Sequence, residues 1–175
     1  MPAFGRAQVL RFAHDGTFPN SRFPVLVYRG VAPVAAGAAA PEVFEALFRR
    51  NGWGSASWRN GLFQVHHYHS TAHEVLGVYG GSVRVQLGGP QGTPVELHAG
   101  DMVVIPAGVV HKNLGASPDF HVVGAYPAGT SPDMNYGQRG ERPEADRNIA
   151  RIPFPGADPV GGQGGELAVL WGKVR

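Results

Sequence analysis

Residues 61–81 read GLFQVHHYHSTAHEVLGVYGG and combine alternating apolar residues with a cluster of histidines. In an extended chain every second side chain lies on the same face. One face of residues 63–69 therefore carries Phe63, Val65, His67 and His69. His67 and His69 are close enough on that face for two imidazoles to bind one ion. The pattern predicts a β-strand that presents two candidate metal ligands.

A second apolar strand is predicted at residues 74–79, directly after a short turn. Glu74 begins this strand and shares a face with Leu76 and Val78, so its carboxylate can approach the two imidazoles if that face is the interior. His73 is the neighbour of Glu74, and regular strand geometry turns only one of the two inward. Both residues are candidates for a further ligand.

Further short strands flank this stretch and are separated by turns rich in glycine. They are predicted at residues 22–29, 83–87, 95–98, 102–105 and 120–126. Gly80-Gly81, Gly88-Gly89 and Gly100-Asp101 mark turns between them. Closely spaced short strands are typical of a small antiparallel barrel or sandwich, so we expect an all-β fold.

The composition agrees with this fold class. The chain has 175 residues and a mass of 18.5 kDa, the length of about one domain. Its 26 glycines and 15 prolines exclude a coiled coil or a helix bundle, because both residues interrupt helices. One short helix is predicted at residues 41–51, which start with a proline and carry acidic residues near the start and two arginines near the end.

Charge and cysteine content exclude several function classes. The formal net charge is +2, and the arginines near the C-terminus are interspersed with acidic residues, so we expect no nucleic-acid partner. The chain has no cysteine, which excludes disulfides, thiolate metal ligands and a cysteine nucleophile. We find no signal-peptide core and no apolar run of about 18 residues, so we expect no membrane partner and a cytoplasmic location.

The C-terminal part of the chain differs from the rest. Residues 127–165 are rich in proline, glycine, aspartate and arginine, and an apolar segment follows at residues 167–171. We expect three regions: residues 1–52 with a strand, a linker and the helix packed on the barrel, residues 53–127 as the barrel core, and residues 128–175 as an extension. The extension is long for a barrel strand, so we expect a lid or an arm that contacts a second copy in a homodimer.

The spacing of glycines and ligand candidates resembles the two motifs of the cupin superfamily. The first motif is matched by Gly61, His67, His69, Glu74 and Gly81. The second motif is matched by Gly100, Pro106, Gly108 and His111. At its end the chain has Gly115 where the family has asparagine, which affects a local turn and not a metal ligand. Across residues 23–127, further runs such as Leu87-Gly88-Gly89 resemble the YjlB-like group of single-domain cupins.

This resemblance implies a fold and a metal site. The fold is a double-stranded β-helix, the jelly-roll barrel of cupins, with a short N-terminal helix and an irregular C-terminal extension. The ion inside the barrel would be held by His67, His69, Glu74 and His111. The family also tolerates a ligand one residue earlier, so His73 in place of Glu74 stays an alternative.

The four proposed ligands limit which metals can bind, and the residues around them are expected to form a pocket. Three neutral imidazoles and one carboxylate leave a divalent ion with a net charge of +1 and, at six-coordination, two open positions. Mn, Fe, Ni, Co, Cu and Zn accept these donors, and Fe(II) or Mn(II) suits redox chemistry at open positions. The pocket for a small-molecule substrate or ligand is expected to be lined by Phe63, Val65, Leu76, Val78, Met102 and His121.

Three functions are compatible with such a site. We expect a dioxygenase-type oxidoreductase acting on a small organic substrate, in which Glu74 is the catalytic base. A metal-dependent isomerase or lyase would use the same ligands. A non-enzymatic module that binds a sugar acid or a small carboxylate is the alternative from another class, so whether the chain is an enzyme stays open.

Overall fold

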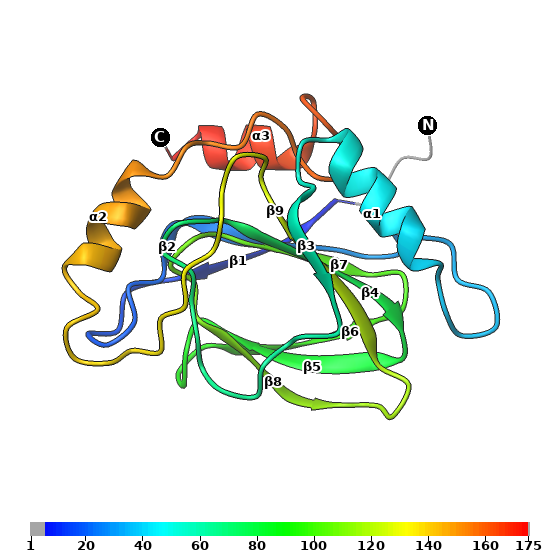
Figure 1. The fold of residues 1–175 in the computed structure, drawn as a ribbon, viewed down its shortest axis with the longest axis horizontal. Coiled ribbons are helices and arrows are strands. Elements are labelled where there is room, and N and C mark those ends of the chain that lie inside the picture. Colours follow the sequence, from blue (N-terminus) through cyan, green and yellow to red (C-terminus); the bar gives the residue numbers. More distant parts are fainter. Residues whose placement is uncertain (1–5, 175) are drawn as a thin grey trace.

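The computed structural model describes residues 6–174 and contains two antiparallel β-sheets with three helices on one side (Figure 1). The strands are β1 (Gln8–Phe12), β2 (Ser21–Tyr28), β3 (Ser55–Arg59), β4 (Glu74–Gly80), β5 (Ser82–Leu87), β6 (Thr93–His98), β7 (Met102–Ile105), β8 (His111–Ala116) and β9 (His121–Tyr126). The helices are α1 (Pro41–Arg50), α2 (Glu144–Arg151) and α3 (Glu166–Gly172). None of these helices is long and apolar enough to cross a membrane. Residues 1–5 and Arg175, which belong to the first and third expected regions, lie outside the described residues.

The two sheets form two facing layers (Figure 1). The larger sheet has the strand order β1-β2-β7-β4-β9-β3, and the smaller sheet has the order β6-β5-β8. Inside the larger sheet β4 pairs with β7, where Glu74 lies opposite Ile105, and with β9, where Val75 lies opposite Ala125. Strands that are distant in the sequence are thus neighbours in each sheet. The all-β jelly-roll fold is confirmed.

Alternate residues of the larger sheet face two separate hydrophobic clusters. Leu76 and Val78 of β4 point between the sheets, where they pack in one cluster with Val85 and Leu97 of the smaller sheet. Val75 belongs to a second cluster on the outer face, which is covered by α1 and α3. Successive side chains change face because a strand is pleated. Both faces of the larger sheet are therefore buried, and its inner strands are apolar at consecutive positions.

Helix α1 confirms the prediction for residues 41–51. It places Phe44 and Phe48 in the cluster on the outer face. The ring of Phe44 lies directly against β4, because Gly77 has no side chain there. A Cβ atom at Gly77 would lie 2.5 Å from the ring of Phe44. This glycine therefore sets how closely α1 approaches the sheet.

The prediction of a regular strand at residues 63–69 is wrong. In the structure this segment is a loop with isolated bridges from His67 to His111 and from Tyr68 to Asn135. Phe63 and Val65 are 50% and 54% exposed. An alternating pattern predicts a strand only where a partner strand pairs with it along its length, and here the pairing is limited to isolated bridges.

Three strands have no counterpart in the sequence-based prediction. β1 and β3 lie at the edges of the larger sheet, where side chains are partly exposed and the apolar pattern is weak. β8 has Leu114 as its one large apolar residue, and this side chain is exposed. These strands are held by backbone pairing with their neighbours, which the side-chain pattern does not reveal.

The C-terminal extension packs on the outer face of the larger sheet (Figure 1). It contains α2 and α3 where irregular structure was expected. Leu167 and Trp171 of α3 are fully buried in the outer cluster. The buried carboxylate of Asp158 joins the extension to the sheet, since it accepts hydrogen bonds from the Tyr28 hydroxyl and from the backbone nitrogen of Leu167. The extension is thus part of the hydrophobic core.

Candidate metal centre

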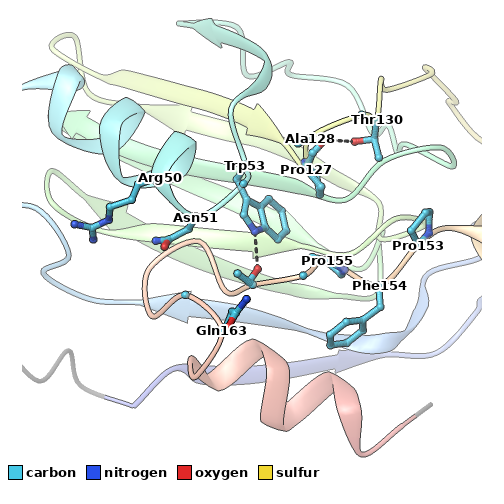
Figure 2. Close-up of a pocket in the computed structure, with 15 residues that line it drawn as sticks. Arg50, Asn51, Trp53, Pro127, Ala128, Thr130, Pro153, Phe154, Pro155 and Gln163 are labelled. Carbon is cyan, nitrogen blue, oxygen red and sulfur yellow. Dashed lines mark hydrogen bonds between the residues drawn. The ribbon is translucent and has the colours of Figure 1, made fainter.

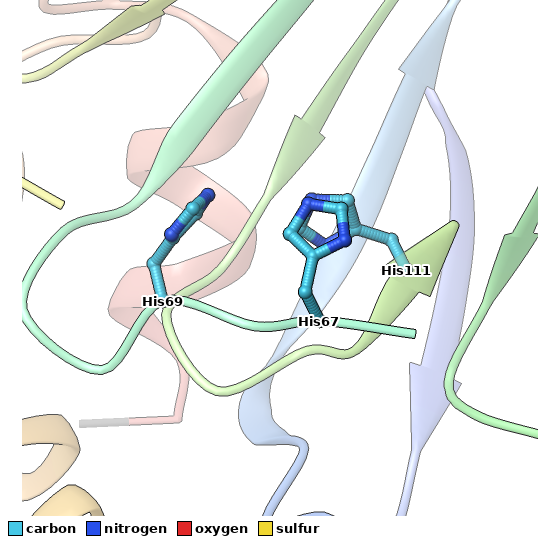
Figure 3. Close-up of side chains that lie close together, drawn as sticks. All are labelled: His67, His69 and His111. Carbon is cyan, nitrogen blue, oxygen red and sulfur yellow. The ribbon is translucent and has the colours of Figure 1, made fainter. Parts of the chain in front are cut away.

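Three buried imidazoles converge on one point (Figure 3). His67 and His69 come from the loop between β3 and β4, and His111 is the first residue of β8. One nitrogen from each ring lies within 4.8 Å of the others. Two backbone hydrogen bonds, from His67 N to His111 O (3.1 Å) and from His111 N to His67 O (2.9 Å), join the segments. These bonds hold together ligand candidates from the two sequence motifs.

Each imidazole is oriented by a backbone carbonyl. The Nδ1 atoms of His67 and His111 donate to the carbonyl two residues earlier, at 2.9 and 3.0 Å. The Nδ1 atom of His69 donates to the Asp133 carbonyl of the extension, at 2.6 Å. A carbonyl accepts only from a protonated nitrogen, so these contacts assign the proton of each neutral ring to Nδ1. Nε2 is left with a lone pair, as a metal ligand requires.

The carboxylate of Glu74 completes the cluster from the first position of β4. Its Oε2 atom lies 3.1 Å from Nε2 of His111 and 3.5 Å from Nε2 of His69. Its Oε1 atom accepts a hydrogen bond from the Tyr126 hydroxyl (2.9 Å), which in turn accepts one from Nε1 of Trp58 (2.9 Å). The contact with Tyr126 therefore decides which carboxylate oxygen faces the imidazoles.

Two atoms of this cluster, Oε2 of Glu74 and Nε2 of His111, are buried without a hydrogen-bond partner among the described residues. With its proton on Nδ1, His111 presents a lone pair to a carboxylate oxygen, and two acceptors repel each other at this distance. A cation between them satisfies both. Divalent transition metals accept imidazole nitrogen and carboxylate oxygen together, so the residues fit a metal site.

The electrostatics of the cluster also favour a cation. Burial, together with the neighbouring His111, lowers the pKa of His67 to about 3. Burial raises the pKa of Glu74, but His69 and His111 outweigh it and hold the pKa below its usual range. Burial lowers the pKa of His69, but Glu74 outweighs it and raises the pKa. Glu74 is therefore ionised, and its buried negative charge favours a cation beside the imidazoles.

A cavity of about 270 Å³ opens beside the imidazoles. Its apolar walls are formed by Trp58, Leu62, Phe63 and Met134. The cavity also reaches His67, His69 and Glu74, so a molecule inside it can approach a bound metal. Phe63 is the one expected pocket residue that lines this cavity.

The other five expected pocket residues lie elsewhere. Leu76 and Val78 are packed in the core between the sheets, and Met102 belongs to the cluster under the helices. Val65 is largely exposed on its loop, and His121 is exposed at the start of β9. The inward residues Leu76 and Val78 were wrongly predicted because they pack in the core, whereas most residues that line the cavity belong to loops.

His73 lies on the opposite side of the chain from Glu74. Its ring packs against Phe23 and Trp171, and its Nδ1 atom accepts a hydrogen bond from the backbone nitrogen of Ala107 (2.9 Å). Burial lowers the pKa of His73 to about 3, so the ring is neutral. The alternative of His73 as a ligand is therefore wrong, because strand alternation turns Glu74 inward and His73 outward.

Sequence reasoning missed two residues that hold the ligands in place. Tyr126 orients Glu74, and its one sequence signal is a hydroxyl at the end of an apolar strand. Asp133 orients His69 through its backbone carbonyl, which no side-chain pattern reveals. The Asp133 carboxylate also accepts hydrogen bonds from the backbone nitrogen (2.6 Å) and the hydroxyl (2.5 Å) of Ser70. These contacts attach the extension to the segment that carries His69.

A larger cavity, of about 510 Å³, lies away from the imidazoles (Figure 2). It is bounded by the end of α1, by Trp53 and by residues 153–157 of the extension. Nε1 of Trp53 donates to the Ala157 carbonyl at 2.7 Å. Arg50 is the one ionisable side chain among the described residues that line this cavity. It offers no set of metal ligands, so the candidate site is the smaller cavity.

The facing sheets and the imidazole and carboxylate cluster define the class of this protein as a cupin. The family described as cupin domain (Cupin_2) matches residues 60–119, which contain the four clustered residues. The chain is also 42% identical over 167 residues to "Uncharacterized protein YjlB" of Bacillus subtilis (strain 168), and this match covers 95% of the chain and 97% of that protein. The chain therefore belongs to the YjlB-like group of cupins.

Similar solved structures are more distant. Acireductone dioxygenase from Bacillus anthracis, with a cadmium ion in its active centre, is 22% identical with a TM-score of 0.39, over 53% of this chain and 62% of that chain. The dTDP-4-dehydrorhamnose 3,5-epimerase from Elizabethkingia anophelis is 11% identical with a TM-score of 0.43, over 85% of this chain and 96% of that chain. At this level of similarity neither structure indicates the function of the chain.

Proposed function

We propose that this chain is a metal-dependent cupin that acts as a dioxygenase-type oxidoreductase on a small organic substrate. The ligands of one divalent transition metal would be His67, His69, Glu74 and His111. The observation that carries the proposal is the contact of two buried acceptors, Nε2 of His111 and Oε2 of Glu74, at 3.1 Å. A shared cation accounts for a pair that has no other hydrogen-bond partner among the described residues.

The donor set bounds the chemistry. When bound, a divalent ion polarises the oxygen atoms of a ligand and, as Fe(II) or Mn(II), supplies redox chemistry. The three neutral imidazoles and the carboxylate leave a net charge of +1 and, at six-coordination, two open positions. Ni, Co, Cu and Zn accept the same donors, and the proposed oxidoreductase activity favours Fe or Mn.

Glu74 is the proposed base. Its Oε2 atom faces His69 and His111, and its Oε1 atom is held by the Tyr126 hydroxyl. Oε2 is also the proposed metal ligand, so it would accept a proton when detached from the metal, while the Tyr126 hydroxyl holds Oε1 in place. The apolar walls of the cavity limit the access of water to this carboxylate.

Metal analysis tests the site. Full-length protein purified without an affinity tag should contain about one transition metal per chain, and His69→Ala and His111→Ala should each lose it. His121→Ala is the matched control, because this exposed histidine lies outside the cluster and its loss should leave the metal content unchanged. Retention of the metal in both cluster variants would overturn the ligand assignment.

Oxygen uptake tests the activity. Fe(II)-loaded protein should consume oxygen in the presence of at least one member of a panel of enediols and keto acids. Conversion of a compound without oxygen uptake would favour the metal-dependent isomerase or lyase. Binding of a compound that is recovered unchanged would favour the non-enzymatic binding module. Either result would replace the dioxygenase proposal.

A further inference from the structure

The cavity beside the imidazoles indicates what kind of molecule the site accepts, and this inference rests on the proposed metal site. Its volume of about 270 Å³ lies just below the range of about 300–1,000 Å³ that is usual for ligand pockets. The occupant is therefore smaller than a typical drug-sized ligand. Its chemistry follows from the walls, the rim and the metal.

The side chains of the walls offer a ligand almost no hydrogen bonds. Three of them, Leu62, Phe63 and Met134, are apolar. The polar atoms of two others are already used, since Nε1 of Trp58 donates to the Tyr126 hydroxyl and this hydroxyl donates to Glu74. Each sugar-like hydroxyl would lose its hydrogen bonds to water here without replacement. The walls therefore select against a polyhydroxylated ligand.

The cationic side chain at the cavity is already paired. Arg59 contacts the carboxylates of Glu45 (2.7 Å) and Glu42 (3.1 Å) on α1. The two carboxylates outnumber the guanidinium, so the rim does not attract a second anionic group on a ligand. This arrangement disfavours dicarboxylates and phosphorylated compounds.

A divalent ion held by the four proposed ligands would attract one negative charge. Three neutral imidazoles and the Glu74 carboxylate leave a divalent ion with a net charge of +1. A monoanionic ligand brings the buried site to neutrality, whereas a neutral or dianionic ligand leaves a net charge that burial makes costly. Phe63 lies beside the proposed metal ligand His67, because the two rings meet edge-on with centroids 5.3 Å apart.

We propose that the site takes a small, mostly apolar monoanion. One end would carry the negative charge on its oxygen atoms and face the metal ligands, as in an enolate, a hydroxamate or an aromatic carboxylate. An aromatic or branched aliphatic body lies against Leu62, Phe63 and Met134. The sugar acids that the sequence left open do not match these walls.

The test uses full-length protein loaded with Co(II), because the visible absorption of Co(II) reports metal binding and ligand binding without turnover. The probes share one metal-binding group and differ in the body: acetohydroxamate, benzohydroxamate and the hydroxamate of gluconic acid. We expect benzohydroxamate to bind about 10- to 100-fold more tightly than acetohydroxamate, because its ring buries apolar surface. Equal affinities for these two, or tightest binding of the gluconic compound, would overturn the proposal.

Two variants test whether the wall of the cavity causes the preference for benzohydroxamate. Phe63→Ala should weaken the binding of benzohydroxamate by about fivefold or more and leave the binding of acetohydroxamate nearly unchanged. Leu114→Ala is the matched control, since this large apolar side chain is 42% exposed and does not line the cavity. If the Phe63 variant loses Co(II), Met134→Ala provides the same comparison.

The two levels of the proposal fail in different ways. If Co(II) remains bound, the ligand class is overturned when the wall variants weaken the binding of both hydroxamates equally or weaken the binding of neither. If the wild-type protein binds no Co(II), the metal site itself is wrong. The spectrum of the protein without hydroxamate separates these two results.

Discussion

At the scale of single residues, the candidate metal site depends on hydrogen bonds that reach it from outside. Backbone carbonyls hold the Nδ1 atoms of the three imidazoles, and the Tyr126 hydroxyl holds Glu74. Such contacts determine the tautomer and the orientation of a ligand before an ion binds. Metal affinity should therefore depend on side chains that do not touch the ion.

Tyr126→Phe tests this dependence. Loss of the hydroxyl frees Oε1 of Glu74 and should weaken metal affinity by about 10- to 100-fold, measured by competition with a chelator of known affinity. Tyr79→Phe is the matched control, because the Tyr79 hydroxyl contacts Asn60 at the surface. Equal affinities of the two variants would contradict the role of Tyr126.

At the scale of elements, two of the contacts that attach the helices to the larger sheet differ in kind. Phe44 of α1 lies against Gly77 of β4, and Asp158 connects β2 to the start of α3. The first contact is steric and the second is polar. The steric contact predicts that an added methyl group lowers stability, and the polar contact predicts that stability depends on pH.

Gly77→Ala should lower the free energy of unfolding by about 1–3 kcal/mol, because the added methyl group overlaps the Phe44 ring. Urea denaturation measures this change. Gly164→Ala is the control, since a Cβ atom there has no neighbour within 4 Å. In a Phe44→Leu background the cost of Gly77→Ala should be smaller, and an unchanged cost would contradict the steric explanation.

Tyr28→Phe should change how stability depends on alkaline pH. Burial and the neighbouring Asp158 raise the pKa of Tyr28 above its usual range. The folded protein thus keeps a proton that the unfolded chain releases above pH of about 10, so this contribution to stability is lost as pH rises past that value.

Denaturation of both proteins at pH 9 and pH 11 measures the effect. Above pH of about 10 the free energy of unfolding of the wild type should fall more steeply than that of Tyr28→Phe, by up to about 1.4 kcal/mol per pH unit. At neutral pH the variant should be about 1–3 kcal/mol less stable, because it removes a buried donor to Asp158. Parallel pH profiles of the two proteins would count against the raised pKa.

At the scale of the whole molecule, the C-terminal extension joins the hydrophobic core to the candidate site. Trp171 is buried on the outer face of the larger sheet, and Met134 lines the cavity. Asp133, in the same extension, holds His69. Metal binding and the stability of the entire fold should therefore be coupled.

Removal of the metal should lower the thermal midpoint of the full chain. At a free metal concentration of one hundred times Kd, binding adds about 2.7 kcal/mol, which corresponds to a shift of roughly 5–10 °C for a chain of this length. Thermal scans with and without a chelator measure the shift. His69→Ala should show the same midpoint in both conditions, and a chelator effect in that variant would contradict the linkage.

The homodimer stays a prediction. Within residues 6–174, the edge strands β1 and β3 each have a strand neighbour on one side only, and such edges can pair with a second copy. Sedimentation of the full chain should give about twice the monomer mass of 18.5 kDa. A monomer at all concentrations tested would contradict the prediction.

Much of the fold and part of the site can be predicted from the sequence. Period-two patterns predict the central strands, because alternation between buried faces is a local property of the chain. The helix at residues 41–51 follows from its terminal residues for the same reason. The motif spacing singles out His67, His69, Glu74 and His111, which the structure brings together.

Contacts between distant segments were decided by the tertiary structure alone. The segment that carries His67 is a loop rather than a strand, because it pairs with other segments at single residues. Glu74 faces inward and His73 outward because β4 lies between two strands that set its orientation. The Asp133 carbonyl that accepts a hydrogen bond from His69 belongs to the extension, far along the chain. The extension also supplies Met134 to the wall of the cavity. Local patterns record which side chains can be buried, but only long-range packing determines what they meet.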